Sequence, residues 1–204
     1  IDIQLSKSLS WLLRHGAASQ GLTLSRYLHP NTTIIYSIAD IERVVKNNDK
    51  QRFKLRTNPQ TNICEIKANQ GHTLSISNTE LTPLLEVKYK TVLHGTYLNC
   101  WSNIKTEGLS RMKRQHIHLA KGGLDDTTVI SGLRRNVQIY IYIDLKKALD
   151  DHILFYESDN GVILTPGNHK GILEPKYFSK VTNVLTGLFF HFKYLQSVNQ
   201  ILIH

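Results

Sequence analysis

Residues 5–16 read Leu-Ser-Lys-Ser-Leu-Ser-Trp-Leu-Leu-Arg-His-Gly. Four leucines in this stretch recur at the spacing of one helix face, and they are Leu5, Leu9, Leu12 and Leu13. This spacing predicts an amphipathic helix over residues 2–15, with Asp2 as its cap and Gly16 as its end. The helix carries Arg14 and His15 into its last turn.

A second helix and a hairpin follow. Residues 37–47 place Ile38, Ile41 and Val44 on one face, which predicts a helix. Residues 53–55 and 63–66 alternate as strands do, and a polar turn joins them. Helices followed by a hairpin predict a winged-helix-like module, which we expect to form a first domain over residues 1–86.

The second half has a different pattern, typical of a mixed domain with short strands. Strands are predicted at 92–96, 117–120, 137–143 and 161–165, and helices at 101–107, 145–150 and 181–204. We expect Gly108 to end the first of these helices. The whole chain is therefore predicted to be α+β, with a second domain over residues 87–204.

Composition limits the class of protein. The chain has 204 residues and a formal net charge of +9, and both halves share the basic excess. Positive charge spread over a folded body suits a polyanionic partner such as nucleic acid. No apolar run is long enough for a membrane span, the N-terminus does not resemble a signal peptide, and the two cysteines are far apart. We expect a reduced intracellular protein.

Arg14 and His15 have two interpretations. Basic residues in the last turn of a helix are favoured by its dipole, which needs no ligand. Guanidinium groups beside an imidazole also suit a phosphate, because the planar fork of Arg matches phosphate oxygens. Arg52 after the second helix, Arg134 in Ser-Gly-Leu-Arg, and the polar Gln70-Gly-His-Thr after the hairpin favour the second interpretation if they meet Arg14.

Three of the histidines in the second half lie in or next to predicted strands. His94-Gly95-Thr96 leaves a strand, where the glycine allows a ligand to approach the backbone. His116 and His118 lie on one strand face and with His94 form a possible zinc set, although no familiar ligand spacing completes it. The other two interpretations of these histidines are that they hydrogen-bond a polar ligand or that they are simply buried in the core. No phosphate-binding loop and no nucleophile motif occurs, so the substrate is expected to supply the nucleophile.

The ordered motifs resemble the NAD-dependent tRNA 2′-phosphotransferase family. The motifs are Leu-Ser-Lys-Ser-Leu-Ser-Trp-Leu-Leu-Arg-His-Gly, Asp-Lys-Gln-Arg-Phe, Ala-Asn-Gln-Gly-His-Thr, Leu-His-Gly-Thr, His-Ile-His-Leu-Ala, Ser-Gly-Leu-Arg and Asn-Gly-Val-Ile-Leu-Thr-Pro-Gly-Asn. The resemblance implies an N-terminal winged-helix-like RNA lobe and a C-terminal ADP-ribosyltransferase-like NAD lobe.

The resemblance also implies a reaction. The internal 2′-phosphate of a ligated tRNA splice junction is transferred to NAD⁺ through an RNA-2′-phospho-ADP-ribose intermediate. Nicotinamide and ADP-ribose 1″,2″-cyclic phosphate are released, and no metal takes part. The partners that it implies are the phosphorylated tRNA and NAD⁺, and we expect a monomer in the cytoplasm or nucleus.

Site residues are implied by the same resemblance. The catalytic tetrad falls on Arg14, His15, Arg52 and Arg134. The NAD contacts fall on His94, Gly95, Thr96, His116, His118, Ser131, Asn160, Gly161 and Val162. RNA contacts are expected at Lys67, Gln70 and His72.

The chain departs from the family pattern at three places. Lys67 replaces the usual Arg, Asp151-His152 replaces Asp-Gly, and the segment 26–36 is shorter than usual. Two other functions stay open: an ADP-ribosyltransferase that acts on nucleic-acid phosphate ends, and a non-catalytic RNA-binding protein.

Overall fold

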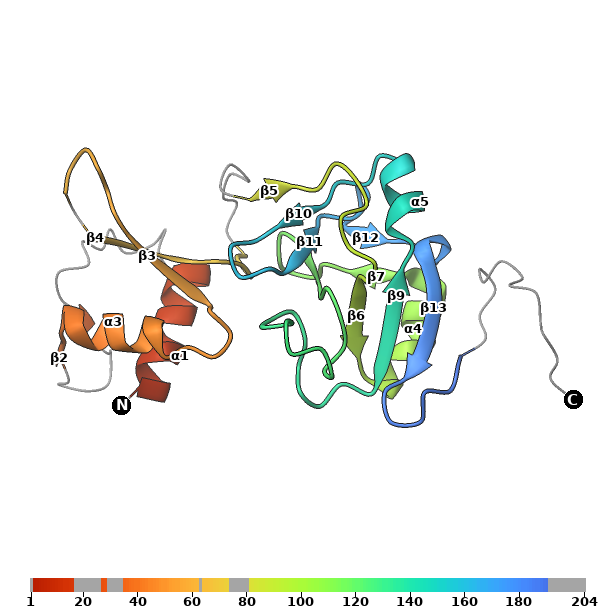
Figure 1. Ribbon diagram of the computed structural model, residues 1–204, viewed down its shortest axis with the longest axis horizontal. Coiled ribbons are helices and arrows are strands. Elements are labelled where there is room, and N and C mark those ends of the chain that lie inside the picture. Colours follow the sequence, from red (N-terminus) through yellow and green to blue (C-terminus); the bar gives the residue numbers. More distant parts are fainter. Residues whose placement is uncertain (1, 17–26, 29–34, 63, 74–80, 191–204) are drawn as a thin grey trace, which may run out of the picture. The chain divides into compact units, whose positions relative to one another are not determined.

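The computed structural model describes residues 2–16, 27–28, 35–62, 64–73 and 81–190 (Figure 1). The chain divides into two compact units. The first contains Ile1–Asn78 and the short segment Lys113–Gln115, and the second contains Thr79–Met112 and His116–His204. Helices and antiparallel strands occur in both units, so the α+β prediction is confirmed.

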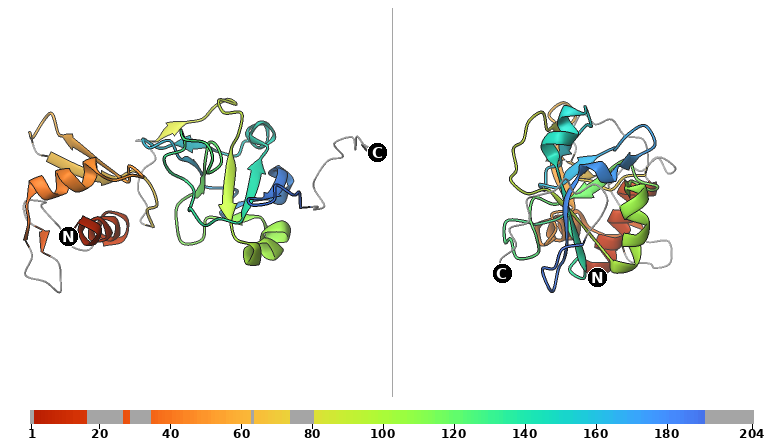
Figure 2. Two further views of the ribbon diagram at one scale, coloured as in Figure 1. Left: turned by 60° about the horizontal axis from the view of Figure 1, so that its bottom comes forward. Right: turned by 90° about the vertical axis from the view of Figure 1, so that its right-hand side faces the viewer.

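The first unit is built from two helices and a hairpin. Its elements are α1 (Asp2–Trp11), the π-helical turn η1 (Leu12–Gly16), β1 (Tyr27–Leu28), β2 (Ile35–Tyr36), α3 (Ile38–Lys46), β3 (Phe53–Thr57) and β4 (Cys64–Ala68). The two long strands form an antiparallel hairpin beside α1 and α3 (Figures 1 and 2). Leu5, Leu9 and Leu12 are buried in its core with Ile41 and Val44, which confirms the predicted leucine face.

Two details of the first helix differ from the sequence prediction. Regular α-helix ends at Trp11, and residues Leu12–Gly16 form a wider π-helical turn. Asp2 is the first helical residue rather than the cap, and its carboxylate pairs with Arg43 at 3.0 Å. The strand pair β1–β2 was not predicted, because each of its strands has only two residues.

The second unit is a set of small antiparallel sheets. Its strands are β5 (Thr82–Pro83), β6 (Leu93–Thr96), β7 (Leu109–Ser110), β8 (Ile117–Leu119), β9 (Ile139–Ile143), β10 (Tyr156–Glu157), β11 (Ile163–Thr165), β12 (Ile172–Leu173) and β13 (Phe178–Asn183). They pair in the orders β5-β10-β11-β8, β13-β9-β6 and β12-β7. The helices are α4 (Leu98–Glu107), α5 (Leu145–Asp150) and the 3₁₀ turn η3 (Pro175–Tyr177).

The helix predicted over residues 181–204 is wrong where the structure describes it. Residues 181–183 belong to β13, which pairs with β9, and Thr182 bridges to Phe189 after a turn. Phe178 and Val181 are buried in the core from this strand, so the pairing outweighs local helical preference. Residues 191–204 lie outside the described residues. The helix α4 also begins three residues before the predicted start at 101.

Among the described residues, no helix combines the length and the apolar character that crossing a bilayer requires.

A capping box begins α3, and it supplies the first testable prediction. The Ser37 hydroxyl accepts from the Asp40 amide at 3.2 Å, and the Asp40 carboxylate accepts from the Ser37 amide at 2.9 Å. Ser37→Ala should destabilise the first unit by about 1 kcal/mol, because one amide of the first turn loses its partner. Faster hydrogen exchange of the α3 amides would report this. Ser102→Ala, on the exposed surface of α4, is the control; equal exchange rates in both variants would contradict the prediction.

Candidate active site

A pocket of about 620 Å³ lies in the first unit, between α1 and the loop that follows α3. Three predicted catalytic residues, Arg14, His15 and Arg52, line one part of it. The other lining residues are Asp2, Ile3, Ser6, Lys7, Ser10, Trp11, Val44, Asn47, Asn48 and Asp49. The structure therefore brings together three of the four tetrad members, which come from two separate elements.

Arg14 is partly buried without a balancing carboxylate. Its Nε atom has no hydrogen-bond partner among the described residues. Burial lowers the pKa of Arg14, and the positive charges of Arg52 and Arg114 lower it further. The Asp49 carboxylate lies 3.8 Å from Arg52 Nη1 and balances part of this charge. An anion bound in the pocket would compensate both the lost hydration of Arg14 and the repulsion that it experiences. The dipole interpretation alone does not explain this cluster.

The segment after the hairpin lies against η1. The Thr73 amide donates to the Arg14 carbonyl at 3.2 Å, and the Thr73 hydroxyl is 2.9 Å from His15 Nδ1. Gly71 has a φ of 89°, and a Cβ there would lie 3.3 Å from Arg14 Nε. A side chain at residue 71 would therefore be strained and would press on the guanidinium. The polar cluster that followed the predicted hairpin is the part of the chain that holds Arg14 and His15.

Arg52 is positioned by a residue that the sequence analysis missed. The side-chain oxygen of buried Asn48 accepts from the Arg52 amide at 3.0 Å and from its Nη1 at 3.4 Å. The Asn48 amide group donates to the Ser6 hydroxyl of α1 at 3.4 Å. On the other side, Asn69 donates its backbone amide to the Arg52 carbonyl at 2.9 Å. Asn48 thus connects Arg52 to Ser6 of α1.

Arg114 was also missed. It belongs to the segment Lys113–Gln115, which joins the first unit although the residues around it belong to the second. The Gln115 amide donates to the His72 carbonyl at 3.1 Å, which fixes this segment beside the residues after the hairpin. The one signal in the sequence is the basic run Arg-Met-Lys-Arg directly before Gln115.

The predicted RNA contacts Lys67, Gln70 and His72 lie between Arg52 and Thr73 in the sequence. Lys67 lies on β4 directly opposite Lys54 of β3, so two positive side chains face each other across the hairpin. Gln70 is buried, and His72 receives the bond from Gln115. The assignment of Lys67, Gln70 and His72 to RNA stays a prediction.

In the second unit, His94 has a defined tautomer. Its Nδ1 lies 2.9 Å from the His118 carbonyl oxygen, which can only accept, so Nδ1 carries the proton and Nε2 is an acceptor. Burial lowers the pKa of His94, and the nearby positive charge of Arg134 also lowers it. His94 is therefore a neutral acceptor with Arg134 in its vicinity.

Two loops of the second unit approach the residues that follow β8. Gly132, in the loop of Ser131 and Arg134, has a φ of 102°, and a Cβ there would lie 3.1 Å from Ala120. A Cβ at Gly161 would lie 2.8 Å from Lys121 Nζ. Arg134 is exposed, and its Nη1 donates to the Tyr97 hydroxyl at 3.2 Å.

Four of the predicted NAD residues have structural roles here. A Cβ at Gly95 would lie 2.6 Å from the side chain of Leu133, so packing explains this glycine and leaves no room for a ligand on that side. Val162 is fully buried, Asn160 accepts from the Ser158 hydroxyl at 2.8 Å, and Thr96 is buried on β6. The backbone amide and carbonyl of Val162 are themselves bonded to Ser158, at 3.1 and 3.0 Å.

The histidines of the zinc alternative make other contacts in the structure. His116 lies just before β8, where its ring meets the Tyr156 ring edge-on at 5.9 Å, and burial lowers its pKa. Within the described ranges, no three His, Cys, Asp or Glu side chains gather as metal ligands.

The cationic cluster predicts anion binding. Inorganic phosphate at constant ionic strength should raise the melting temperature of the protein, because a ligand of the folded state alone stabilises it. Arg14→Gln should remove most of this rise. Arg56→Gln is the matched control, because Arg56 is exposed on β3 and paired with Glu65 at 2.7 Å. An equal rise in all three proteins would show that phosphate acts elsewhere.

Asn48 gives a second prediction for the pocket. Asn48→Ala should weaken phosphate binding about tenfold and destabilise the fold by about 1–3 kcal/mol, because the Arg52 amide and guanidinium lose a buried acceptor. Isothermal titration with phosphate and urea unfolding measure the two effects. Unchanged phosphate affinity in a destabilised Asn48→Ala protein would mean that Asn48 supports the fold and not the position of Arg52.

Comparisons with known proteins identify the family of the chain. The family described as RNA 2′-phosphotransferase, Tpt1 / KptA family, matches residues 1–167. The chain is 44% identical over 190 residues to tRNA 2′-phosphotransferase 1 of Danio rerio, covering 88% of this chain and 84% of the relative. It is 43% identical over 189 residues to tRNA 2′-phosphotransferase 1 of Homo sapiens, with 88% and 75% covered. It is 37% identical over 183 residues to tRNA 2′-phosphotransferase of Saccharomyces cerevisiae, with 80% and 78% covered. The resemblance found in the sequence is confirmed, and the chain belongs to the RNA 2′-phosphotransferase, Tpt1 / KptA family.

Proposed function

We propose that the protein removes an internal 2′-phosphate from RNA, such as a ligated tRNA splice junction carries, by transferring it to NAD⁺. The observation that carries this proposal is the pocket in which Arg14, His15 and Arg52 converge, with the Arg14 Nε unpartnered. A phosphate monoester near pH 7 has about two negative charges and three acceptor oxygens, which match several guanidinium donors. The relatives' names point to the same substrate class.

The first step needs no nucleophile from the protein. An oxygen of the RNA 2′-phosphate forms a bond to C1″ of the nicotinamide ribose, and the bond from C1″ to the nicotinamide nitrogen breaks. Neutral nicotinamide leaves with the bonding electrons, and the RNA-2′-phospho-ADP-ribose remains. Arg14 and Arg52 orient the phosphate and balance its charge, and orientation of this kind contributes a large part of a rate enhancement.

The second step transfers the phosphate. The ribose 2″-hydroxyl attacks phosphorus, the bond from phosphorus to the RNA 2′-oxygen breaks, and that oxygen takes up a proton. The products are RNA with a 2′-hydroxyl and ADP-ribose 1″,2″-cyclic phosphate, so one proton moves from the 2″-hydroxyl to the RNA. His15 is the group in the pocket that can carry it, with Thr73 holding its Nδ1.

The second unit is proposed to supply the NAD site. His94 Nε2 offers an acceptor, Arg134 a cation and Ser131 a hydroxyl. The Asn160–Gly161 turn lies beside Lys121, and the Asn160 side-chain oxygen already accepts from Ser158. We assign the first unit as a winged-helix-like RNA lobe, with Lys67, Gln70 and His72 as RNA contacts, and the second as an ADP-ribosyltransferase-like lobe.

The test is a short RNA with one internal 2′-phosphate, incubated with and without NAD⁺. The phosphate should be lost only with NAD⁺, in step with release of nicotinamide. Arg14→Ala, Arg52→Ala and Arg134→Ala should each lower the rate by about 100-fold or more, and the paired Arg56→Ala should not. Accumulation of the phospho-ADP-ribosylated RNA with one of these variants would assign the substituted residue to the second step.

Three outcomes would contradict the proposal or part of it. Loss of phosphate without NAD⁺ would exclude the reaction. Labelling of terminal phosphates but not of the internal 2′-phosphate would favour an ADP-ribosyltransferase instead. A full rate with Arg134→Ala would remove that residue from the site.

A further inference from the structure

The pocket continues along α1 beyond the residues assigned to phosphate. Lys7, Ser10 and Trp11 line this extension from α1, and the backbone there carries them one to two turns before Arg14. Leu5 and Leu9 lie on the other face of the same helix and are fully buried in the core. The helix thus has one face for the core and a second that forms a wall of the pocket.

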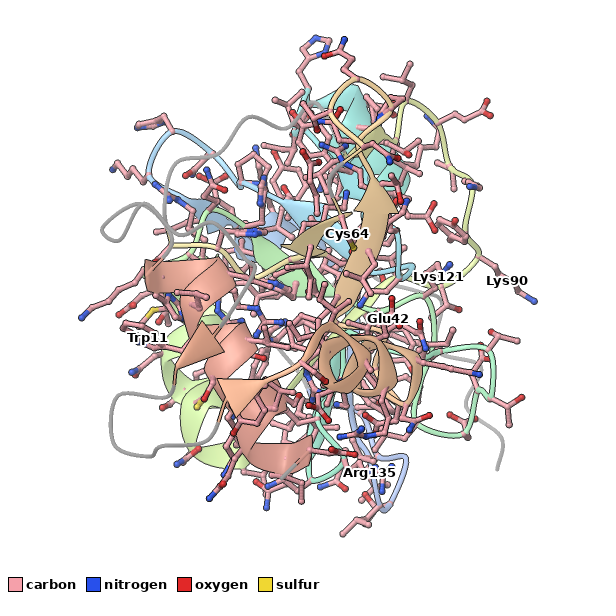
Figure 3. The ribbon with its side chains drawn as sticks, turned by 90° about the vertical axis from the view of Figure 1, so that its left-hand side faces the viewer. Trp11, Glu42, Cys64, Lys90, Lys121 and Arg135 are labelled. Carbon is pink, nitrogen blue, oxygen red and sulfur yellow. The ribbon has the colours of Figure 1, made fainter. Side chains whose placement is uncertain are left out.

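Trp11 is exposed and yet held in place. Its side chain is 55% exposed, although it is among the largest apolar groups in the chain. A Cβ at Gly16 would lie 2.8 Å from its ring carbon Cζ3, so the indole packs directly on the glycine backbone. Figure 3 shows Trp11 projecting from α1. An indole fixed on one side and open on the other is suited to stack with a planar ligand.

Lys7 adds a positive charge to the same wall. It lies four residues before Trp11, which is one helical turn, and it makes no ion pair within the part of the chain that the structure describes. The nearest acidic residue of α1, Asp2, is already paired with Arg43. The extension therefore presents an aromatic face and a cation without an ion pair among the described residues, next to Arg14.

We propose that Trp11 and Lys7 form a subsite for the nucleotide next to the one that carries the 2′-phosphate. The base stacks on Trp11, and Lys7 pairs with the neighbouring backbone phosphate. Unstacked bases on aromatic side chains beside basic residues are the usual way in which proteins hold single-stranded RNA. This inference rests on the proposed function, and it adds that the RNA is gripped as an unpaired strand.

The first test is binding, measured by indole fluorescence without NAD⁺. The probe is a short single-stranded RNA with one internal 2′-phosphate. It should quench the emission of Trp11, because Trp101 is buried. Trp11→Phe should remove the quenching and keep most of the affinity. Quenching that persists in Trp11→Phe would overturn the proposal, since another residue would be its source.

The second test pairs a protein variant with an altered RNA. Trp11→Ala should lower kcat/KM on this RNA by about 10- to 100-fold, the usual loss for one base–aromatic stack, with KM carrying the change. Trp11→Tyr should restore it. An RNA with an abasic nucleotide on one side of the phosphorylated one should lower kcat/KM of the unaltered protein by the same factor. The same abasic RNA should not lower kcat/KM of Trp11→Ala any further. If Trp11→Ala lowers kcat/KM by the same factor on the normal RNA and on the abasic RNA, stacking is contradicted.

The role of Lys7 can be tested separately by the salt dependence of RNA binding. Lys7→Gln should lower the slope of log affinity against log salt by about one, and Lys46→Gln, on α3 outside the pocket, should not. An unchanged slope in Lys7→Gln would remove Lys7 from the subsite. Failure of the proposed function looks different, because the unaltered protein would then leave the 2′-phosphate on every RNA.

Discussion

The partly buried guanidinium of Arg14 is the constraint around which the pocket of the first unit is organised. Arg14 is partly buried beside Arg52 and Arg114, and its Nε has no partner among the described residues. Such an arrangement costs free energy in the absence of a ligand, so the surrounding structure has to hold it. An anion with several acceptor oxygens removes the cost, and a phosphate monoester is the anion that fits the number of donors.

The hydrogen bonds around the pocket show how the chain holds this arrangement. Thr73 fixes the Arg14 carbonyl and the His15 ring, while Asn48 and Asn69 hold the backbone and guanidinium of Arg52. These supporting residues lie in loops, but helix α1 and the hairpin β3–β4 place the loops. Groups that are fixed before the substrate binds lose little entropy on binding, which is how a site without a protein nucleophile can accelerate transfer.

The sequence allowed the scaffold to be predicted better than the supports of the site. The leucine face of α1 and the alternation of β3 and β4 are periodic, so burial dictates them. Asn48 and Arg114 carry no such signal. The bond of Asn48 to Ser6 and the interaction of Arg114 with Arg14 join residues far apart in sequence, and the bond of Asn48 to Arg52, four residues away, follows no periodicity. The strand at 181–183 was mistaken for helix for the same reason: pairing with β9 decides its structure.

The central claim is that Arg14, His15 and Arg52 hold the 2′-phosphate itself, and ³¹P NMR tests it most directly. The monoester resonance of an RNA with one internal 2′-phosphate is separate from the diester resonances of its backbone. Without NAD⁺, addition of the protein should shift or broaden the monoester resonance, and Arg14→Gln should abolish this change while Arg56→Gln does not. A monoester resonance that stays unperturbed while the diester resonances move would contradict the account.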